Sequence, residues 1–270
     1  MKIDPVEKPQ QRGYLRKLLG KEYFILRRKI KWLKEADSFA KIEPSTDFNH
    51  LCFEHQSILL RPLKDVDMYL QHNKIVNLRL AAERINGVTI HPGQTFSIWN
   101  LVGRPTKKKG YLEGLTLENG RTGKGIGGGL CQLGNLIYWM SIHTPLSIKE
   151  RWRHGYDVFP DINRSIPFGC GATLSYNYID LQIENTSEQS FRIEVWLDEE
   201  YLRGKITSNA PIDVKYQIKE EDHHFAQQWW GGYTRHNKIF RIATYGDGRE
   251  TREMIAENNA IMMYNPMLNA

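Results

Sequence analysis

Apolar positions recur at helical spacing in three segments of the chain. The first is a stripe from Leu15 to Leu33, and the second begins at Asp65 and ends at Asn86-Gly87, where a glycine follows the last periodic residue. The third follows a cluster of glycines and has apolar residues at 130, 133, 136, 137 and 140. Each spacing predicts a helix with one face toward a core.

After the third helix, alternation of apolar and polar positions replaces helical spacing. It predicts strands over Ser147–His154, Ala172–Ile183, Ser190–Leu197, Tyr201–Ile206, 212–218, 238–244 and 260–264. Shorter extended segments come before the glycines, at Val88–Ile90, Thr95–Trp99 and Leu115–Leu117. Because helices dominate the first half and strands the second, the order predicts an α+β fold.

The expected α+β architecture has N-terminal helices, a central glycine loop with a cysteine helix, and a C-terminal, mainly antiparallel sheet. We expect three regions along the sequence. Residues 1–44 form a basic amphipathic helix with a polar tail that we expect to be disordered, 45–210 form the main domain, and 211–270 form a β-rich extension packed on it.

The positive charge of the chain is concentrated at one end. The 270 residues have a net charge of +6, but residues 1–34 carry 11 Lys or Arg against three acidic residues, so the rest of the chain has a balance of −2. A docked surface helix with a solvated basic face is the favoured interpretation. The alternative is that residues 15–34 bind an anionic membrane surface or a partner's groove. Nucleic acid is not an expected partner, because no binding motif accompanies the charge.

Cysteine usage and hydropathy restrict the class of protein. Cys52, Cys131 and Cys170 are odd in number and widely spaced, which predicts neither a disulfide framework nor a zinc site. The sequence has no apolar signal region and no apolar run long enough to span a membrane. We therefore expect a cytoplasmic protein, or one peripheral at the inner membrane face, without metal or cofactor.

The stretch from Gly123 to Gly129 holds five glycines and leads directly into the helix that begins near Cys131. Unpaired N–H groups and the dipole at a helix start favour a thiolate, so this position predicts a lowered thiol pKa and a nucleophile. The other interpretation is a small buried residue that closes a tight glycine turn.

A glycine loop before a helix also suggests a site for an anionic ligand. The Gly-Lys-Ser/Thr ending of nucleotide-binding loops is absent, so a nucleotide is not expected. The expected ligand-binding residues combine the loop with nearby cations, which bind carboxylates or phosphates well: Lys124, Gly127, Gly128, Gly129, Gln132, Arg151 and Arg153, with Arg164 in the same basic cluster.

A thiol nucleophile needs a base, and His154 is the candidate because His143 would lie at the far end of the same helix. If the strand that carries His154 packs against the helix start, His154 meets Cys131, and Asp157 or Asp161 would orient its ring. A hydrogen-bonded structural histidine is the equal alternative.

Several segments resemble the VanW family, which is named for an accessory protein of B-type vancomycin-resistance clusters. The resemblance extends over roughly residues 75–210, and its most specific part is Gly127-Gly128-Gly129-Leu130-Cys131-Gln132. The other segments that carry it are Arg79–Gly87, His91–Ser97, His154, Gly169–Tyr176 and Asn185-Thr186. Members of the family often have an aspartate before the alanine and threonine that stand here at 172 and 173. This chain has Gly171 there, so the resemblance supplies no carboxylate for His154.

The resemblance implies an accessory role in glycopeptide resistance or in cell-envelope and peptidoglycan metabolism. It leaves open whether the chain is an enzyme. As an enzyme it would perform acyl transfer or amide hydrolysis on a cell-wall peptide, with Cys131 as nucleophile, His154 as base and N–H groups near Gly129–Gln132 as oxyanion donors. As a binding or scaffold module it would hold an anionic precursor, a partner peptide or the inner membrane face.

Overall fold

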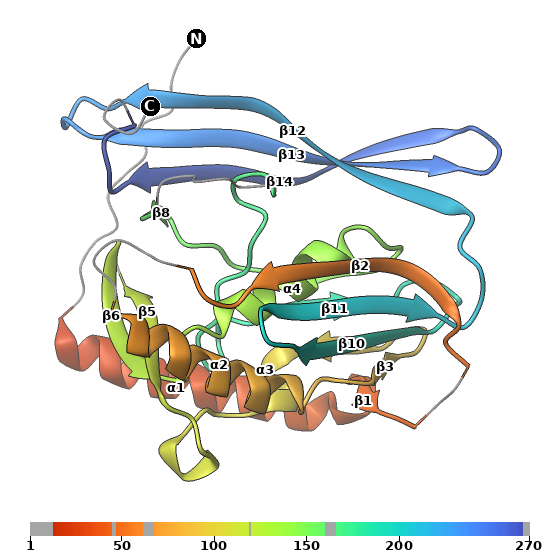
Figure 1. The fold of residues 1–270 in the computed structure, drawn as a ribbon, viewed down its shortest axis with the longest axis horizontal. Coiled ribbons are helices and arrows are strands. Elements are labelled where there is room, and N and C mark those ends of the chain that lie inside the picture. Colours follow the sequence, from red (N-terminus) through yellow and green to blue (C-terminus); the bar gives the residue numbers. More distant parts are fainter. Residues whose placement is uncertain (1–12, 45–46, 62–66, 119, 160–165, 267–270) are drawn as a thin grey trace.

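A five-stranded antiparallel sheet in the order β1-β3-β10-β11-β2 forms the centre of the molecule (Figure 1). The computed structural model describes residues 13–44, 47–61, 67–118, 120–159 and 166–266. The central sheet takes strands from both halves of the sequence. They are β1 (Lys41–Ile42), β2 (His50–Ile58), β3 (Val88–Ile90), β10 (Phe191–Leu197) and β11 (Tyr201–Ser208).

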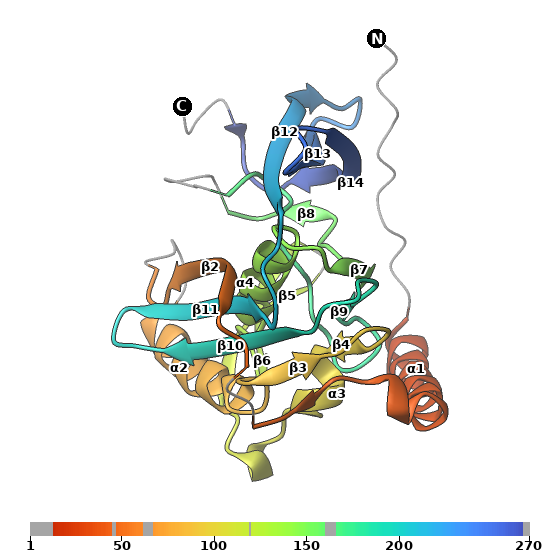
Figure 2. The same ribbon diagram turned by 90° about the vertical axis from the view of Figure 1, so that its right-hand side faces the viewer.

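Two helices cover the opposite faces of this sheet. Figures 1 and 2 place α2 (Met68–Ala82) on one side and α4 (Cys131–Ser141) on the other. The apolar positions that predicted α4 are all at most 3% exposed. They are Leu130, Leu133, Leu136, Ile137 and Met140. Burial of this face against the sheet, at about 25 cal/mol per Å² of apolar surface, is what fixes the start of α4 in place.

Smaller elements surround the central sheet. A three-stranded sheet has the order β4-β9-β7, and a hairpin is formed by β5 and β6. The bounds of these strands are Thr95–Ser97 (β4), Glu113–Glu118 (β5), Arg121–Ile126 (β6), Ser147–Glu150 (β7) and Gln182–Glu184 (β9). The short helices are η1 (Ala36–Ser38), α3 (Ile98–Val102) and η2 (Lys107–Lys109).

A second antiparallel sheet of long strands lies beyond α4, at the top of Figure 1. It contains β12 (Val214–Gln227), β13 (Tyr233–Tyr245) and β14 (Glu250–Met262), and β14 pairs in parallel with the short strand β8 (Tyr156–Asp157). The expected C-terminal strands are therefore present and are longer than predicted. Because β8 comes from the middle of the chain, it ties this sheet to the main body.

The N-terminal helix α1 (Tyr14–Lys34) docks on the domain with a face different from the predicted one. Ile25 is 3% exposed, Trp32 packs against the core, and Arg28 forms an ion pair with Glu150 at 2.6 Å. The predicted apolar stripe lies outside, because its members are 48–79% exposed: Leu15, Leu19, Tyr23, Leu26, Ile30 and Leu33. The favoured interpretation was thus wrong about which face is solvated.

The α+β class is confirmed, but the separation of helices from strands along the sequence is not. Strands β2 and β3 come from the first half and pair with β11 and β10 from the second, and β1 joins the same sheet by pairing with β3. The alternating segment Ala172–Ile183 is mostly irregular and forms a strand only from Gln182. The predicted tail, residues 1–12, lies outside the described residues, and the three-region division stays a prediction.

Candidate functional site

The glycine-rich stretch is divided between a strand and a turn. Gly123 and Gly125 lie in β6, where they pair with β5, and the turn of residues 127–130 leads into α4. The loop is therefore shorter than the sequence predicted. Cys131 is the first residue of α4, so its backbone is held by the turn on one side and by the buried helix on the other.

The glycines of the turn are required by close contacts. Gly127 and Gly129 have φ of +76° and +90°, a region that side chains disfavour. A Cβ on Gly128 would lie 2.3 Å from the carbonyl carbon of Gly114 in β5. A Cβ on Gly129 would meet the side chain of Lys74 at the same distance. These glycines let the turn pass between α2 and the β5–β6 hairpin.

Two residues of α2 that were not predicted to belong to the site hold this turn. The amide nitrogen of Asn77, a fully buried residue, donates to the carbonyls of Gly128 at 2.9 Å and Leu112 at 3.0 Å, and its oxygen accepts from the Leu112 N–H at 2.8 Å. Lys74 packs on Gly129, and burial, followed by the charge of Arg61, lowers the pKa of Lys74 to about 8. An asparagine inside the apolar sequence Ile75-Val76-Asn77-Leu78 was the available signal.

Several N–H groups of the turn are used by the fold itself. Those of Gly127, Gly128 and Gln132 donate to carbonyls of Leu112, Gly125 and Gly129. Within the described part of the chain, the N–H groups of Gly129 and Leu130 donate to no acceptor. Two backbone donors of the turn are thus unpaired among the described residues, fewer than the glycine-rich sequence suggested.

The environment of Cys131 differs from the expected one. Burial of the sulfur raises the pKa of the Cys131 thiol, and N–H groups of Leu174 and of Cys131 itself oppose this effect without overcoming it. The residue as a whole is half-buried, but its sulfur is enclosed. The prediction that the helix start lowers this pKa was therefore wrong, because desolvation is the larger effect.

His154 lies on the segment between β7 and β8, near the residues that contact Cys131. The Thr173 N–H donates to the Trp152 carbonyl at 2.8 Å, and Thr173 directly precedes Leu174, whose backbone meets the Cys131 sulfur. Burial, followed by the charge of Arg153, lowers the pKa of His154. Both shifts favour neutral forms at pH 7, a thiol and an imidazole.

Asp157, one of the two carboxylates proposed to orient His154, makes its hydrogen bonds elsewhere. Asp157 is buried in β8 and accepts from Tyr264 at 2.9 Å and Arg235 at 3.4 Å. No hydrogen bond joins Asp157 to His154 among the residues described, so the assignment of Asp157 as the orienting carboxylate stays a prediction that these contacts do not support. Asp161 and Arg164 lie outside the described residues.

The candidate ligand-binding side chains also make internal contacts. Arg151 donates to the carbonyls of Gly169 and Gly171, and the guanidinium of Arg153 lies 3.9 Å from the centre of the Phe168 ring. These two arginines thus hold the segment 168–171, which continues to Leu174.

Lys124 and Gln132 connect the glycine-rich stretch to its neighbours. Lys124 is exposed on β6 and donates to Tyr69 at 2.8 Å and Asp67 at 3.1 Å, at the start of α2. The amide nitrogen of Gln132 donates to the Ser57 hydroxyl at 2.9 Å and the Ile58 carbonyl at 2.8 Å, at the end of β2. The amide of Gln132 therefore fixes α4 to the central sheet.

A cavity of about 360 Å³ opens beside the β5–β6 hairpin. It is lined by residues of α2, η2 and the hairpin rather than by Cys131 or His154, and these are Asn73, Lys107, Gly110, Tyr111, Leu112, Glu113 and Ile126. It lies next to the glycine turn, because Leu112 is also the residue that Asn77 binds. This cavity has room for a bound peptide next to the turn.

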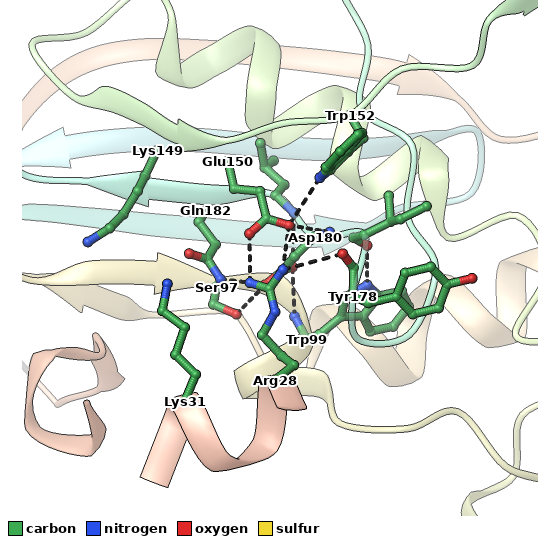
Figure 3. A network of polar contacts seen from close by, with 12 residues as sticks. Arg28, Lys31, Ser97, Trp99, Lys149, Glu150, Trp152, Tyr178, Asp180 and Gln182 are labelled. Carbon is green, nitrogen blue, oxygen red and sulfur yellow. Dashed lines mark hydrogen bonds and ion pairs between the residues drawn. The ribbon is translucent and has the colours of Figure 1, made fainter. Parts of the chain in front are cut away.

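A second polar cluster, shown in Figure 3, surrounds the fully buried Asp180. Its carboxylate accepts from the Ser97 hydroxyl at 2.6 Å and from the Leu181 N–H at 2.9 Å, and also from the Trp99 N–H and the Gln182 amide. Burial raises the pKa of Asp180 to about 7, although these donors oppose the shift.

The same cluster receives α1. Glu150 accepts from Arg28 at 2.6 and 2.8 Å, and the other donors to this carboxylate are the Asp180 N–H and the Trp152 ring nitrogen (Figure 3). This cluster lies on β7 and β9 and serves the packing of α1. It was not predicted, because nothing in the local sequence marks Asp180 as buried.

In the described ranges, no group of three or more His, Cys, Asp or Glu side chains is arranged to hold a metal ion. No described helix has the length and apolar character that crossing a bilayer requires.

The chain matches the family model of VanW like protein over residues 73–207, which include the glycine turn, Cys131 and His154. It is 36% identical over 193 residues to the vancomycin B-type resistance protein VanW of Enterococcus faecalis, covering 72% of this chain and 70% of that protein. It is also 30% identical over 120 residues to the uncharacterized protein YoaR of Bacillus subtilis, covering 43% of this chain and 37% of that protein. No solved structure matches. The chain therefore belongs to the VanW family.

Proposed function

We propose that this protein is an accessory protein of glycopeptide resistance that binds a cell-wall peptide beside the start of α4. The observation that carries the proposal is the 36% identity to a vancomycin-resistance protein over 70% of that protein's length. The turn that precedes Cys131 lies inside the region matched by the family model. It also adjoins the cavity beside the β5–β6 hairpin, which gives a peptide room to lie.

The chemistry of the turn supports binding of an anionic group. The N–H groups of Gly129 and Leu130 are unused within the described residues, and the positive end of the α4 dipole lies at Cys131. Lys74 packs against Gly129 and is still largely protonated at pH 7, because its pKa is about 8. The terminal carboxylate of a peptide fits this combination of donors and charge.

A peptide-binding experiment tests this role. A synthetic cell-wall pentapeptide with a free carboxylate is expected to bind the protein, and its amidated form is expected to bind about tenfold more weakly, since a charge-assisted hydrogen bond contributes roughly 1.5–3 kcal/mol. Lys74→Met should weaken binding of the free acid by a similar factor, whereas Lys109→Met, in the exposed η2, should not. Isothermal titration calorimetry measures the affinity of the wild type for the free acid and for the amide, and the affinity of each variant for the free acid. Equal affinity for acid and amide would contradict the proposal.

Acyl transfer or amide hydrolysis is the second candidate function, and the backbone link between Cys131, Leu174, Thr173 and Trp152 is the observation that favours it. In that reaction His154 takes the thiol proton while sulfur adds to the carbonyl carbon. The proton then goes to the departing amine, and water or a second amine releases the acyl group from the thioester. A neutral Cys131 thiol and a neutral His154 imidazole are compatible with base-assisted attack but not with a resting thiolate.

Alkylation of Cys131 by iodoacetamide separates the two functions. Because burial raises the pKa of the thiol, we expect the labelling rate of Cys131 to rise with a midpoint above about 8.5, the value of a free thiol. His154→Gln should leave that rate unchanged in a binding module. Mass-spectrometric peptide mapping at each pH distinguishes Cys131 from Cys52 and Cys170 and makes Cys52 an internal control. A labelling rate at pH 7 that falls severalfold in His154→Gln would support the nucleophile instead, because His154 would then be the base that takes the thiol proton.

A further inference from the structure

The exposed face of α1 has the composition of a surface that inserts into a lipid interface. Six large apolar side chains follow each other on this helix, and Leu15, Leu19 and Leu33 are at least 70% exposed. At 3.6 residues per turn, the six fall within an arc of about 80°. The docked residues Ile25 and Trp32 fall on the opposite side. The stripe is therefore continuous and faces away from the domain.

Basic residues border this stripe on both sides. Helical geometry places Arg16, Arg27 and Lys34 along one edge and Lys29 along the other. These four side chains are exposed, and they form no ion pair within the described part of the chain. The only acidic residue of α1, Glu22, is bound by Arg104 at 3.0 Å. The border thus presents positive charge that no described acidic group neutralises.

A second basic element is connected to α1. The loop that contains Lys107, Lys108 and Lys109 projects from the lower edge in both views, and α1 runs along the lower part of the molecule in Figure 1 and at its right-hand side in Figure 2. All three lysines are exposed, and the Arg104–Glu22 ion pair connects the start of this loop to α1. This loop thus adds positive charge next to α1, beyond the cations of the helix itself.

We infer that α1 binds an anionic phospholipid surface, with its leucine stripe in the interface and the flanking cations at the headgroups. A long apolar stripe bordered by Arg and Lys is the pattern of helices that lie in a bilayer interface, where apolar burial and attraction to anionic lipids add. The docked face, held by Arg28 and Glu150, keeps the domain attached to the helix. This role is independent of the peptide site at α4.

Vesicle co-sedimentation of the full chain tests the inference. Binding to vesicles of phosphatidylcholine with phosphatidylglycerol should exceed binding to phosphatidylcholine alone and should weaken with added salt. The double substitution Arg27→Glu with Lys34→Glu should lower the partition coefficient at least twentyfold, at about fivefold for each cation removed. Leu19→Glu with Leu26→Glu should abolish binding. Because all four side chains are exposed, the folded domain should survive, as circular dichroism would check.

The matched control pairs Leu51→Glu in β2 with Lys215→Glu in β12, both exposed and away from α1, and it should bind vesicles as the wild type does. Light scattering after gel filtration supplies the competing outcome. A wild-type dimer that Leu19→Glu with Leu26→Glu converts to a monomer, without vesicle binding by the wild type, would show that a second copy covers the stripe and would overturn the inference. Equal binding to neutral and anionic vesicles would overturn the part played by charge.

Discussion

Gly128→Ala is expected to lower the free energy of unfolding by about 3 kcal/mol or more, which places it at the upper end of overpacking effects. The added Cβ would lie 2.3 Å from both the carbonyl carbon and the oxygen of Gly114, which are backbone atoms and cannot rotate away. Either β5 or the turn must shift. A shift of the turn would move the start of α4, so Cys131 labelling by iodoacetamide should change in the same variant.

Gly155→Ala is the matched control for this substitution. Gly155 lies on the His154 segment, a Cβ added to it would have no heavy atom within 4 Å, and its φ is not positive. Its replacement should change the unfolding free energy by no more than about 1 kcal/mol in either direction. Urea unfolding followed by circular dichroism measures both variants. A loss below about 1 kcal/mol in Gly128→Ala would mean that the turn tolerates a side chain and that its glycines are not required by packing.

The second large effect concerns the pH dependence of stability, which Asp180 should dominate between about pH 4 and 7. Burial raises the pKa of Asp180 from 3.8 to about 7 in the folded protein. An acid whose folded pKa is raised contributes stability that is fully present below its unfolded pKa and is lost as pH rises through the folded pKa. The shift corresponds to about 4 kcal/mol lost between about pH 4 and pH 8.

Asp180→Asn isolates this contribution, because an amide does not titrate. Its nitrogen would face the Ser97 hydroxyl and the Gln182 amide, which donate to Asp180 in the wild type, so the variant should be less stable than the wild type at about pH 4. The difference should then shrink by about 4 kcal/mol toward pH 8 as the wild type loses stability. Unfolding curves at a series of pH values measure it. A difference that stays constant or grows with pH would show that the four donors keep the carboxylate ionised.

Elements with a strong local period were predictable from the sequence. The spacing of apolar residues gave α2 and α4 within a few residues, and alternation gave β10 and β11. The strand β2 was missed, because it is an edge strand whose residues are mostly partly or fully exposed. The segment before Gln182 alternates but is not a strand. Its backbone is bound instead by Asn135 and by the Trp152 carbonyl, contacts that only the tertiary fold creates.

The candidate site was predictable in position but not in chemistry. The glycines before an apolar helix indicated a tight turn at Cys131, and the structure has one. The direction of the Cys131 pKa was not predictable, because it depends on burial by Leu174 and its neighbours, which come from another part of the chain. The contacts of Asn77 and Lys74 with the turn were not predictable either, because both residues reach it from α2. Nor were the partners of Asp157, which are Arg235 in β13 and Tyr264 just after β14.

The pairing of β2 with β11 has a consequence for the order in which the chain folds during synthesis. His50 pairs with Ser208, so β2 waits for about 150 residues before its partner leaves the ribosome. Until β10 and β11 follow, only β1 and β3 of this sheet can pair, and the apolar face of α4 lacks β11, one of the two strands on which it packs. Pairings this distant in sequence form slowly and leave the nascent chain open to aggregation. The half-made polypeptide, rather than the finished domain, is the species that most needs a chaperone.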